Sequence, residues 1–295
     1  MKLCRFWRPN RGAAVGLAVG DEVYDLSDAD AGRYGSFTGL IHSGDLAEEL
    51  RNIFPRAGSP YCSWAELDRQ TGLNTPHLLA PITKQEVWAA GVTYLRSRDA
   101  RMGESPEGGS FYDKVYHAAR PELFFKATAR RVSAPHEPVR IRRDSRWNVP
   151  EPELVLVVNG RGALAGFTIG NDMSSRDIEG ENPLYLPQAK VYKGCCALGP
   201  AVVPAGAIKD ARTITIRLQI SRGGTIVFEG KTSIAQMKRN FGELIEYLFR
   251  EQEFPDGVLL MTGTGLVPPD SFTLQSGDVV EITVPEIGTL RNPVA

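Results

Sequence analysis

The sequence predicts a strand-rich α+β protein with few helices, and three observations support this class. Apolar residues occur mostly in short runs that alternate with polar residues or end at glycine, which is typical of β-strands. Few stretches carry apolar side chains at helical spacing, and strands and helices do not alternate regularly as in a doubly wound sheet. With 295 residues, 42% of them hydrophobic, the chain can bury a large core.

The first part of the chain predicts a small α+β unit. Residues 3–26 alternate between apolar and polar side chains, which predicts a short antiparallel sheet. Further along, Leu46, Leu50, Ile53 and Phe54 share one face at helical spacing. This unit therefore contains both strands and at least one helix.

A proline-rich stretch separates this unit from the rest of the chain. Ser63 and Glu66 have the spacing of a helix capping box, and residues 75–81 then read as an extended linker. We therefore expect a small N-terminal domain over residues 1–80 and a larger domain over residues 81–295.

The larger domain is predicted to consist mainly of strands. The strands are expected at residues 87–91, 122–126, 154–158, 163–170, 214–220, 225–228, 259–262 and 279–284. A helix is predicted over residues 94–102. A second, longer helix is also predicted. Ser233 and Gln236 have the spacing of a capping box at its start, and its apolar stripe begins at Met237. The polar, glycine-rich segment 103–110 is either disordered or a mobile cover over a site.

Charge and cysteine content exclude several classes of partner. The formal net charge is −1, so neither nucleic acid nor an anionic membrane is expected to bind. No apolar run approaches the roughly 20 residues that span a bilayer, and the N-terminus does not resemble a signal peptide. The four cysteines fit neither a disulfide framework nor a CxxC metal site, so we expect reduced thiols in a soluble, cytoplasmic protein.

An acidic cluster borders the predicted strands 154–158 and 163–170. Glu151 and Glu153 project to the same side of a strand, because side chains alternate along it. If the two strands pair about a turn near Arg161, Asp172 lies opposite Glu151 at a cross-strand distance of about 5 Å. Three converging carboxylates raise one another's pKa unless a cation binds, and oxygen ligands favour Mg²⁺, Mn²⁺ or Ca²⁺ over zinc. The alternative is a solvated strand end with separate salt bridges to Arg161 or Arg176.

These residues resemble a known family, the fumarylacetoacetate hydrolase superfamily. The resemblance lies in Glu151-Pro152-Glu153-Leu154, in residues 171–177, in Lys190 followed by Gly199-Pro200, and in the closing segments 277–281 and 288–294. Segments 120–126 and 177–188 look most like the members that dehydrate 2-keto-3-deoxy-D-arabinonate. The resemblance implies a rolled, mixed β-sheet core in a catalytic domain, with Mg²⁺ held by Glu151, Glu153 and Asp172.

The resemblance also implies roles for residues around that metal. Glu122 and Lys190 would be catalytic, with Glu122 as the base for a C3 proton and Lys190 holding the negative charge that develops. Substrate contacts would come from four further residues, Thr93, Lys126, Arg176 and Thr264. The implied reaction converts a 2-keto-3-deoxy-pentonate to 2,5-dioxopentanoate, with segment 103–118 closing over the substrate, in a homodimer or homotetramer.

One departure from the family pattern bears on the reaction. Hydrolytic members carry a histidine after the Gly-x-x-Tyr motif, whereas here Gly91-Val92-Thr93-Tyr94 is followed by Ser97 at that position. Serine alone is no base at neutral pH, which weakens the hydrolytic reading, although His117 is a conceivable substitute. Hydrolysis of an acylpyruvate or fumarylacetoacetate-type substrate, decarboxylation of a 2-oxo diacid, and non-catalytic binding of a sugar acid stay open as alternatives.

Overall fold

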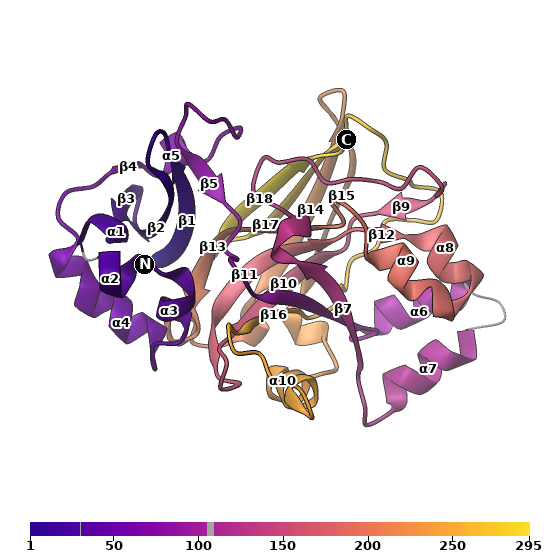
Figure 1. Cartoon of the computed structure of the whole chain (residues 1–295). Helices are drawn as coiled ribbons and strands as arrows, with labels where there is room; N and C mark the ends of the chain where they lie inside the picture. Colours follow the sequence, from indigo (N-terminus) through magenta and orange to yellow (C-terminus); the bar gives the residue numbers. More distant parts are fainter. Residues whose placement is uncertain (30, 105–108) are drawn as a thin grey trace.

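The computed structural model describes residues 1–29, 31–104 and 109–295 (Figure 1). Part of the glycine-rich segment expected to cover the site, residues 105–108, lies outside the described residues. On either side of it the chain is helical, since α6 ends at Glu104 and α7 begins at Gly109.

Strands dominate the chain. They are β1 (Lys2–Arg8), β2 (Gly12–Val19), β3 (Glu22–Asp25), β4 (Cys62–Ser63), β5 (His77–Leu79), β6 (Glu86–Gly91), β7 (Glu122–Thr128), β8 (Val132–Ser133), β9 (Asn148–Val149), β10 (Pro152–Val158), β11 (Leu164–Asp172), β12 (Ser174–Ser175), β13 (Cys196–Pro204), β14 (Thr215–Arg222), β15 (Thr225–Ser233), β16 (Val258–Met261), β17 (Val279–Val284) and β18 (Gly288–Pro293). The α-helices are α1 (Leu26–Ala29), α2 (Ala31–Tyr34), α3 (Phe37–Ile41), α4 (Leu46–Ile53), α5 (Trp64–Leu67), α6 (Leu95–Glu104), α7 (Gly109–His117), α8 (Arg176–Glu181), α9 (Leu186–Lys190) and α10 (Phe241–Phe249).

The largest sheet is mixed, and it runs in the order β4-β3-β2-β1-β13-β11-β10-β16-β6-β7. Its β16–β6 pair is parallel, and β8 also joins β13 in parallel, whereas β10, β11 and β13 pair antiparallel. A second sheet, β15-β14-β17-β18, packs against it (Figure 1). The prediction of a strand-rich α+β fold with a mixed sheet is confirmed.

The N-terminal strands form one end of the large sheet. β1, β2 and β3 pair antiparallel, as predicted, and β1 meets β13 at Leu3 and Val202. The stretch predicted to be an extended linker contains β5, which pairs with β1, so the chain is extended there and also joins the sheet. A domain boundary near residue 80 stays a prediction.

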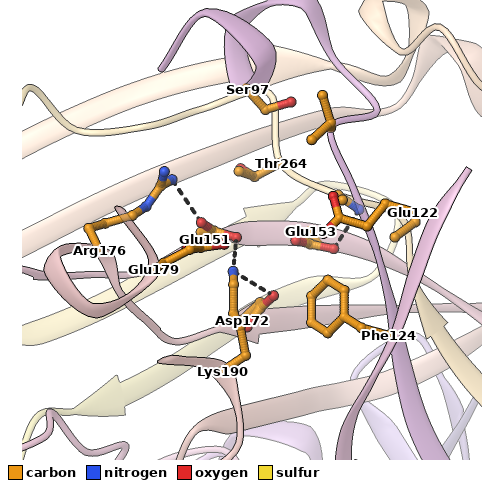
Figure 2. Close-up of a pocket in the computed structure, with 14 residues that line it drawn as sticks. Ser97, Glu122, Phe124, Glu151, Glu153, Asp172, Arg176, Glu179, Lys190 and Thr264 are labelled. Atoms are coloured by element: carbon orange, nitrogen blue, oxygen red, sulfur yellow. Dashed lines mark hydrogen bonds and ion pairs between the residues drawn. The ribbon is translucent and has the colours of Figure 1, made fainter. Parts of the chain in front are cut away.

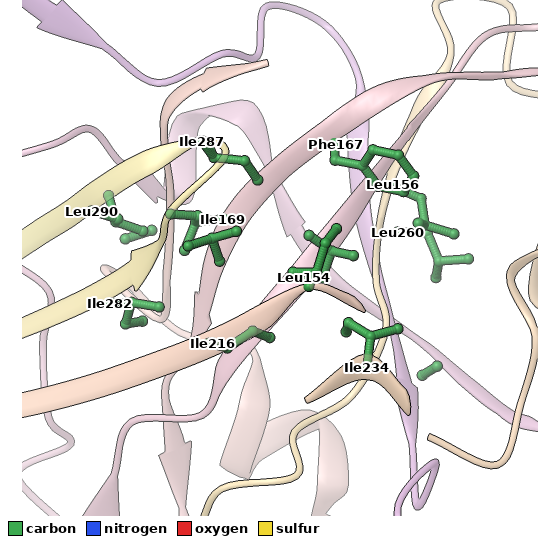
Figure 3. Packing of buried hydrophobic residues seen from close by; sticks show 14 of the residues in the cluster. Leu154, Leu156, Phe167, Ile169, Ile216, Ile234, Leu260, Ile282, Ile287 and Leu290 are labelled. Atoms are coloured by element: carbon green, nitrogen blue, oxygen red, sulfur yellow. The ribbon is translucent and has the colours of Figure 1, made fainter. Parts of the chain in front are cut away.

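Strand β10 lies at the centre of the sheet, with both faces buried. Leu154, Leu156 and Val158 pack toward the second sheet (Figure 3), whereas Val155 and Val157 pack against the opposite core. A strand covered on both faces reads as a continuous apolar run, which is the pattern of residues 154–158. The charged residues just before this run therefore lie at the edge of the buried core.

The long helix near residue 240 begins later than predicted. Ser233 is the last residue of β15 and caps only the single 3₁₀ turn Ile234–Gln236. Helix α10 begins after Asn240, whose side chain accepts a hydrogen bond from the backbone N–H of Glu243 at 2.8 Å. By contrast, the capping box between Ser63 and Glu66 is present as predicted.

All four cysteines are free thiols, as expected. Cys4, Cys195 and Cys196 are buried, and burial together with the neighbouring Cys62 raises the pKa of Cys4 to about 12. Across the described residues, we find no helix with the length and apolar character needed to cross a bilayer.

Candidate active site

Three carboxylates converge where β10 begins and β11 ends. Glu151, Glu153 and Asp172 are all buried, and one ligand atom of each lies within 4.8 Å of the others. The backbone N–H of Asp172 donates to the carbonyl of Glu151 at 2.9 Å, in line with the pairing of Pro152 with Asn171. The predicted cross-strand arrangement of Glu151 and Asp172 is confirmed.

Buried cations surround two of the three carboxylates (Figure 2). Arg176 lies 2.7 Å from Glu151 Oε1, and the Lys190 ammonium lies 2.7 Å from Glu151 Oε2 and 3.1 Å from Asp172 Oδ2. The same ammonium donates to Ser174 Oγ at 2.5 Å. The solvated strand end of the alternative is wrong, because these side chains are at most 5% exposed, whereas its salt bridge to Arg176 is present.

Glu153 has a different environment. Its Oε2 accepts a hydrogen bond of 2.6 Å from the backbone N–H of Gly263, and among the described residues no lysine or arginine forms an ion pair with it. Burial, followed by repulsion from Asp172 and Glu151, raises the pKa of Glu153 well above its ordinary value.

This donor set fits a divalent cation. The three side chains offer only oxygen ligands, which Mg²⁺, Mn²⁺ and Ca²⁺ prefer. The raised pKa of Glu153 comes first from burial and then from repulsion by Asp172 and Glu151. A cation held by the triad would relieve that repulsion.

The triad lines a small pocket. The residues lining it are Ala90, Gly91, Val92, Ser97, Glu122, Phe124, Glu151, Glu153, Asp172, Arg176, Glu179, Lys190, Gly263 and Thr264. They come from the end of β6, the start of β7, the β10–β11 pair, the helices α8 and α9, and the turn after β16. The cavity volume between these side chains is about 20 Å³, roughly the space of one water molecule.

Most of the predicted site residues meet in this pocket. Glu122, Arg176, Lys190 and Thr264 line it together with the triad. Figure 2 shows Arg176 and Glu122 on opposite sides of the carboxylates.

Two residues expected to bind substrate lie outside the pocket lining. Lys126 is fully buried beneath it, where its ammonium pairs with Asp172 and donates to the carbonyls of Met173 at 2.9 Å and Lys190 at 2.5 Å. Burial lowers the pKa of Lys126, but attraction to Asp172 and weaker neighbours outweighs this and leaves it raised. Thr93 is also fully buried, and its hydroxyl donates to the carbonyl of Thr262 at 2.7 Å. Both side chains thus hold other parts of the site in place.

Neither Ser97 nor His117, the two residues considered for hydrolysis, is placed to act as a base in the pocket. Ser97 lines the pocket, but its hydroxyl donates to the carbonyl of Tyr94 at 2.8 Å and accepts from the N–H of Tyr94 at 3.2 Å. His117 is absent from the pocket lining, and its side chain is 62% exposed at the end of α7.

Sequence reasoning missed several residues that line the pocket. Phe124 follows Glu122 by two positions, so strand alternation alone indicated the shared face. Its ring lies 5.7 Å from the Lys190 ammonium. Glu179 belongs to the acidic run after Asp172. Its side chain reaches the pocket because this run forms helix α8, which begins at Arg176. Val92 has a φ of 52°, an uncommon value for a β-branched residue, and no sequence signal indicates it.

The family follows from comparison with known proteins. The model of the fumarylacetoacetate (FAA) hydrolase C-terminal domain matches residues 87–295, and the chain belongs to this family.

Relatives with assigned activities are similar over most of their length. The chain is 47% identical to a probable 2-keto-3-deoxyxylonate dehydratase of Haloferax volcanii, over 92% of each chain. It is 44% identical to the 2-dehydro-3-deoxy-D-arabinonate dehydratase of Saccharolobus solfataricus, over 77% of this chain and 81% of the relative. A solved structure of 2-keto-3-deoxy-D-arabinonate dehydratase complexed with magnesium and 2,5-dioxopentanoate is 36% identical, with a TM-score of 0.81 over 100% of this chain and 98% of the other.

Proposed function

We propose that this protein is a Mg²⁺-dependent dehydratase that converts a 2-keto-3-deoxy-pentonate to 2,5-dioxopentanoate. The observation that carries the proposal is one buried pocket that combines three oxygen ligands with Glu122 and Lys190. The similarity to two dehydratases, and to a solved dehydratase complex with magnesium and this product, supports the same reaction.

The triad of Glu151, Glu153 and Asp172 would hold the cation. When bound, Mg²⁺ would supply positive charge that favours negative charge on the oxygens of a 2-oxo acid, and Mn²⁺ or Ca²⁺ are possible substitutes. Arg176 and Lys190 form ion pairs with Glu151 and orient its carboxylate, and Lys126 does the same for Asp172. These cationic side chains therefore hold the carboxylates in position whether or not the metal is bound.

Glu122 and Lys190 would carry the proton chemistry. Glu122 removes a C3 proton, and the Lys190 ammonium donates a hydrogen bond to the oxygen on which negative charge develops. The C4–O bond breaks and the proton that Glu122 took from C3 goes to the departing hydroxyl, so water leaves and a C3–C4 double bond remains. Transfer of a C5 proton to C3 then gives an enol that tautomerises to the aldehyde. Arg176 and Thr264 would contact the substrate directly, whereas Thr93 and Lys126 would act by holding the turn at Thr262 and Asp172.

A substrate panel with Glu122→Gln tests the proposal. The purified protein with Mg²⁺ should release 2,5-dioxopentanoate from a 2-keto-3-deoxy-pentonate and no pyruvate from acylpyruvates. Glu122→Gln keeps the size of the side chain but removes the base, so turnover should fall by about 10²–10⁴-fold while Mg²⁺ binding persists.

The outcomes separate the alternatives. Pyruvate release would indicate a hydrolase, loss of CO₂ from a 2-oxo diacid would indicate a decarboxylase, and substrate binding without turnover would indicate a sugar-acid binding protein. Near-normal turnover of Glu122→Gln would remove that residue from the role of base.

We also propose a cytoplasmic homodimer or homotetramer. The four free cysteines support a reducing compartment. β15 is the edge strand of the second sheet and exposes Ile226 and Val227, which supports burial against another copy of the chain. Light scattering on the purified protein tests the assembly, and the mass of a single chain would contradict it.

A further inference from the structure

The carboxylate of Glu122 lies over a glycine on the neighbouring strand. Gly91, the last residue of β6, pairs with Glu122, the first residue of β7. A Cβ atom added to Gly91 would lie 2.1 Å from Glu122 Oε2 and 2.6 Å from its Cδ. Since non-bonded atoms do not approach so closely, the Glu122 carboxylate occupies the space that any other side chain at position 91 would fill.

Backbone conformation does not explain why position 91 holds a glycine. Gly91 is not among the glycines with positive φ, so an L-residue can adopt its backbone geometry. Gly263, just after the neighbouring strand β16, is the contrasting case, because its φ of +90° strains any other residue. The turn that ends β6 is made by the next residue, Val92, with its φ of 52°. What position 91 requires is therefore the absence of a side chain.

The atoms in the way belong to the flexible end of a side chain. The three atoms nearest to the added Cβ are all in the Glu122 carboxyl group, and none belongs to the backbone. Glu122 is only partly buried, so its carboxylate can swing aside when a methyl group appears. An alanine at position 91 thus displaces the carboxylate, and the displacement affects whatever depends on the position of Glu122.

We infer that Gly91 is a positioning residue, whose bare Cα fixes the place of the Glu122 carboxylate at the edge of the pocket. The inference rests on the proposed function, in which Glu122 removes a proton from the substrate. A base acts only within hydrogen-bond reach of the proton, and a misplacement of 1 Å lowers rates by about 10²-fold.

The test is a double-mutant cycle between Gly91→Ala and Glu122→Asp. Gly91→Ala should have the melting temperature, the Mg²⁺ affinity and the KM of the wild type, while its kcat is about 10–100-fold lower. Glu122→Asp withdraws the carboxylate by one methylene group, so it also lowers kcat but no longer meets the new methyl group. Adding Gly91→Ala to Glu122→Asp should therefore lower kcat by less than twofold. Gly44→Ala, at a glycine without positive φ and with no atom within 4 Å of an added Cβ, is the matched control and should match the wild type.

Each outcome decides one question. Wild-type kcat in Gly91→Ala, or losses that multiply in the double variant, would overturn the positioning role. If Gly91→Ala is unstable, recovery of its melting temperature in the double variant supports the contact with Glu122, and no recovery overturns it. If instead Glu122→Gln and Glu122→Asp both keep full activity, the assignment of Glu122 as the base fails, whatever Gly91→Ala does.

Discussion

At the residue scale, the site is a balance of buried charges. Lys126, Arg176 and Lys190 are each at most 1% exposed, and each pairs with a carboxylate of the triad. Buried ions are tolerated only when they are paired, so these cations and carboxylates depend on one another. Asp172 contacts both lysines, which makes it structural as well as a proposed metal ligand.

We expect Asp172→Asn to weaken both metal binding and folding. The amide keeps the size of the side chain but removes the charge shared by Lys126 and Lys190, so the free energy of unfolding should fall by about 3 kcal/mol. Mg²⁺ affinity, measured by calorimetry below the unfolding temperature, should fall at least ~100-fold because a charged ligand is lost.

Asp177→Asn is the control for that variant. Asp177 accepts hydrogen bonds from Ser145 Oγ at 2.5 Å and from the Arg146 N–H at 2.6 Å, and it does not line the pocket. Its replacement should leave Mg²⁺ affinity unchanged. Unaltered affinity in Asp172→Asn would exclude Asp172 as a ligand.

The triad could be predicted from the sequence because it depends on short-range geometry. Strand alternation relates Glu151 to Glu153, and a turn near Arg161 sets Asp172 opposite Glu151. The fit between Gly91 and Glu122 could not be predicted in this way. It depends on β6 pairing with a strand that begins 31 positions later, after two helices, and neither residue carries a local signal for that register.

At the element scale, α10 illustrates how local signals compete. Ser233 with Gln236 and Asn240 with Glu243 have the same capping spacing, and the apolar stripe follows both. The first pair does not start the helix, because Ser233 is held in the ladder opposite Thr215. Only the pairing of β14 with β15 decides which of the two capping pairs starts the helix.

We expect Asn240→Ala to destabilise the protein by about 1 kcal/mol, because α10 loses the acceptor for the N–H of Glu243. Urea unfolding measures this change. Asn240→Ser keeps a capping oxygen and should lose much less. Equal stability of Asn240→Ala and the wild type would mean that this cap contributes nothing to folding.

At the scale of the whole molecule, strand order was the part of the fold that sequence could not supply. β13 joins the N-terminal strands to the catalytic core, yet its run from Cys196 to Pro204 was not predicted as a strand. Its partner β1 lies at the other end of the chain from it in sequence terms, near the N-terminus, and several apolar strands could pair with β1 in its place. Local patterns therefore predicted which segments are strands better than which strands are neighbours.

Strand β1, which pairs with β13, also carries a buried thiol that links the stability of the whole protein to pH. Cys4 on β1 is fully buried, and burial raises its pKa to about 12, against 9.0 for an ordinary thiol. Above pH 9 the unfolded chain releases this proton while the folded chain keeps it, so stability should fall as pH rises from 9 towards 12. For one fully protected thiol, the loss amounts to about 1.4 kcal/mol at pH 10.

Cys4→Ala should flatten this part of the stability profile. The variant is expected to be less stable than the wild type at pH 8, because a buried sulfur is lost. Between pH 8 and pH 10, its free energy of unfolding in urea should fall by about 1.4 kcal/mol less than that of the wild type. Some slope remains, because burial also raises the pKa values of Cys196 and Tyr94 and acts in the same direction. Equal slopes in both proteins would show that Cys4 ionises as readily in the folded chain as in the unfolded one.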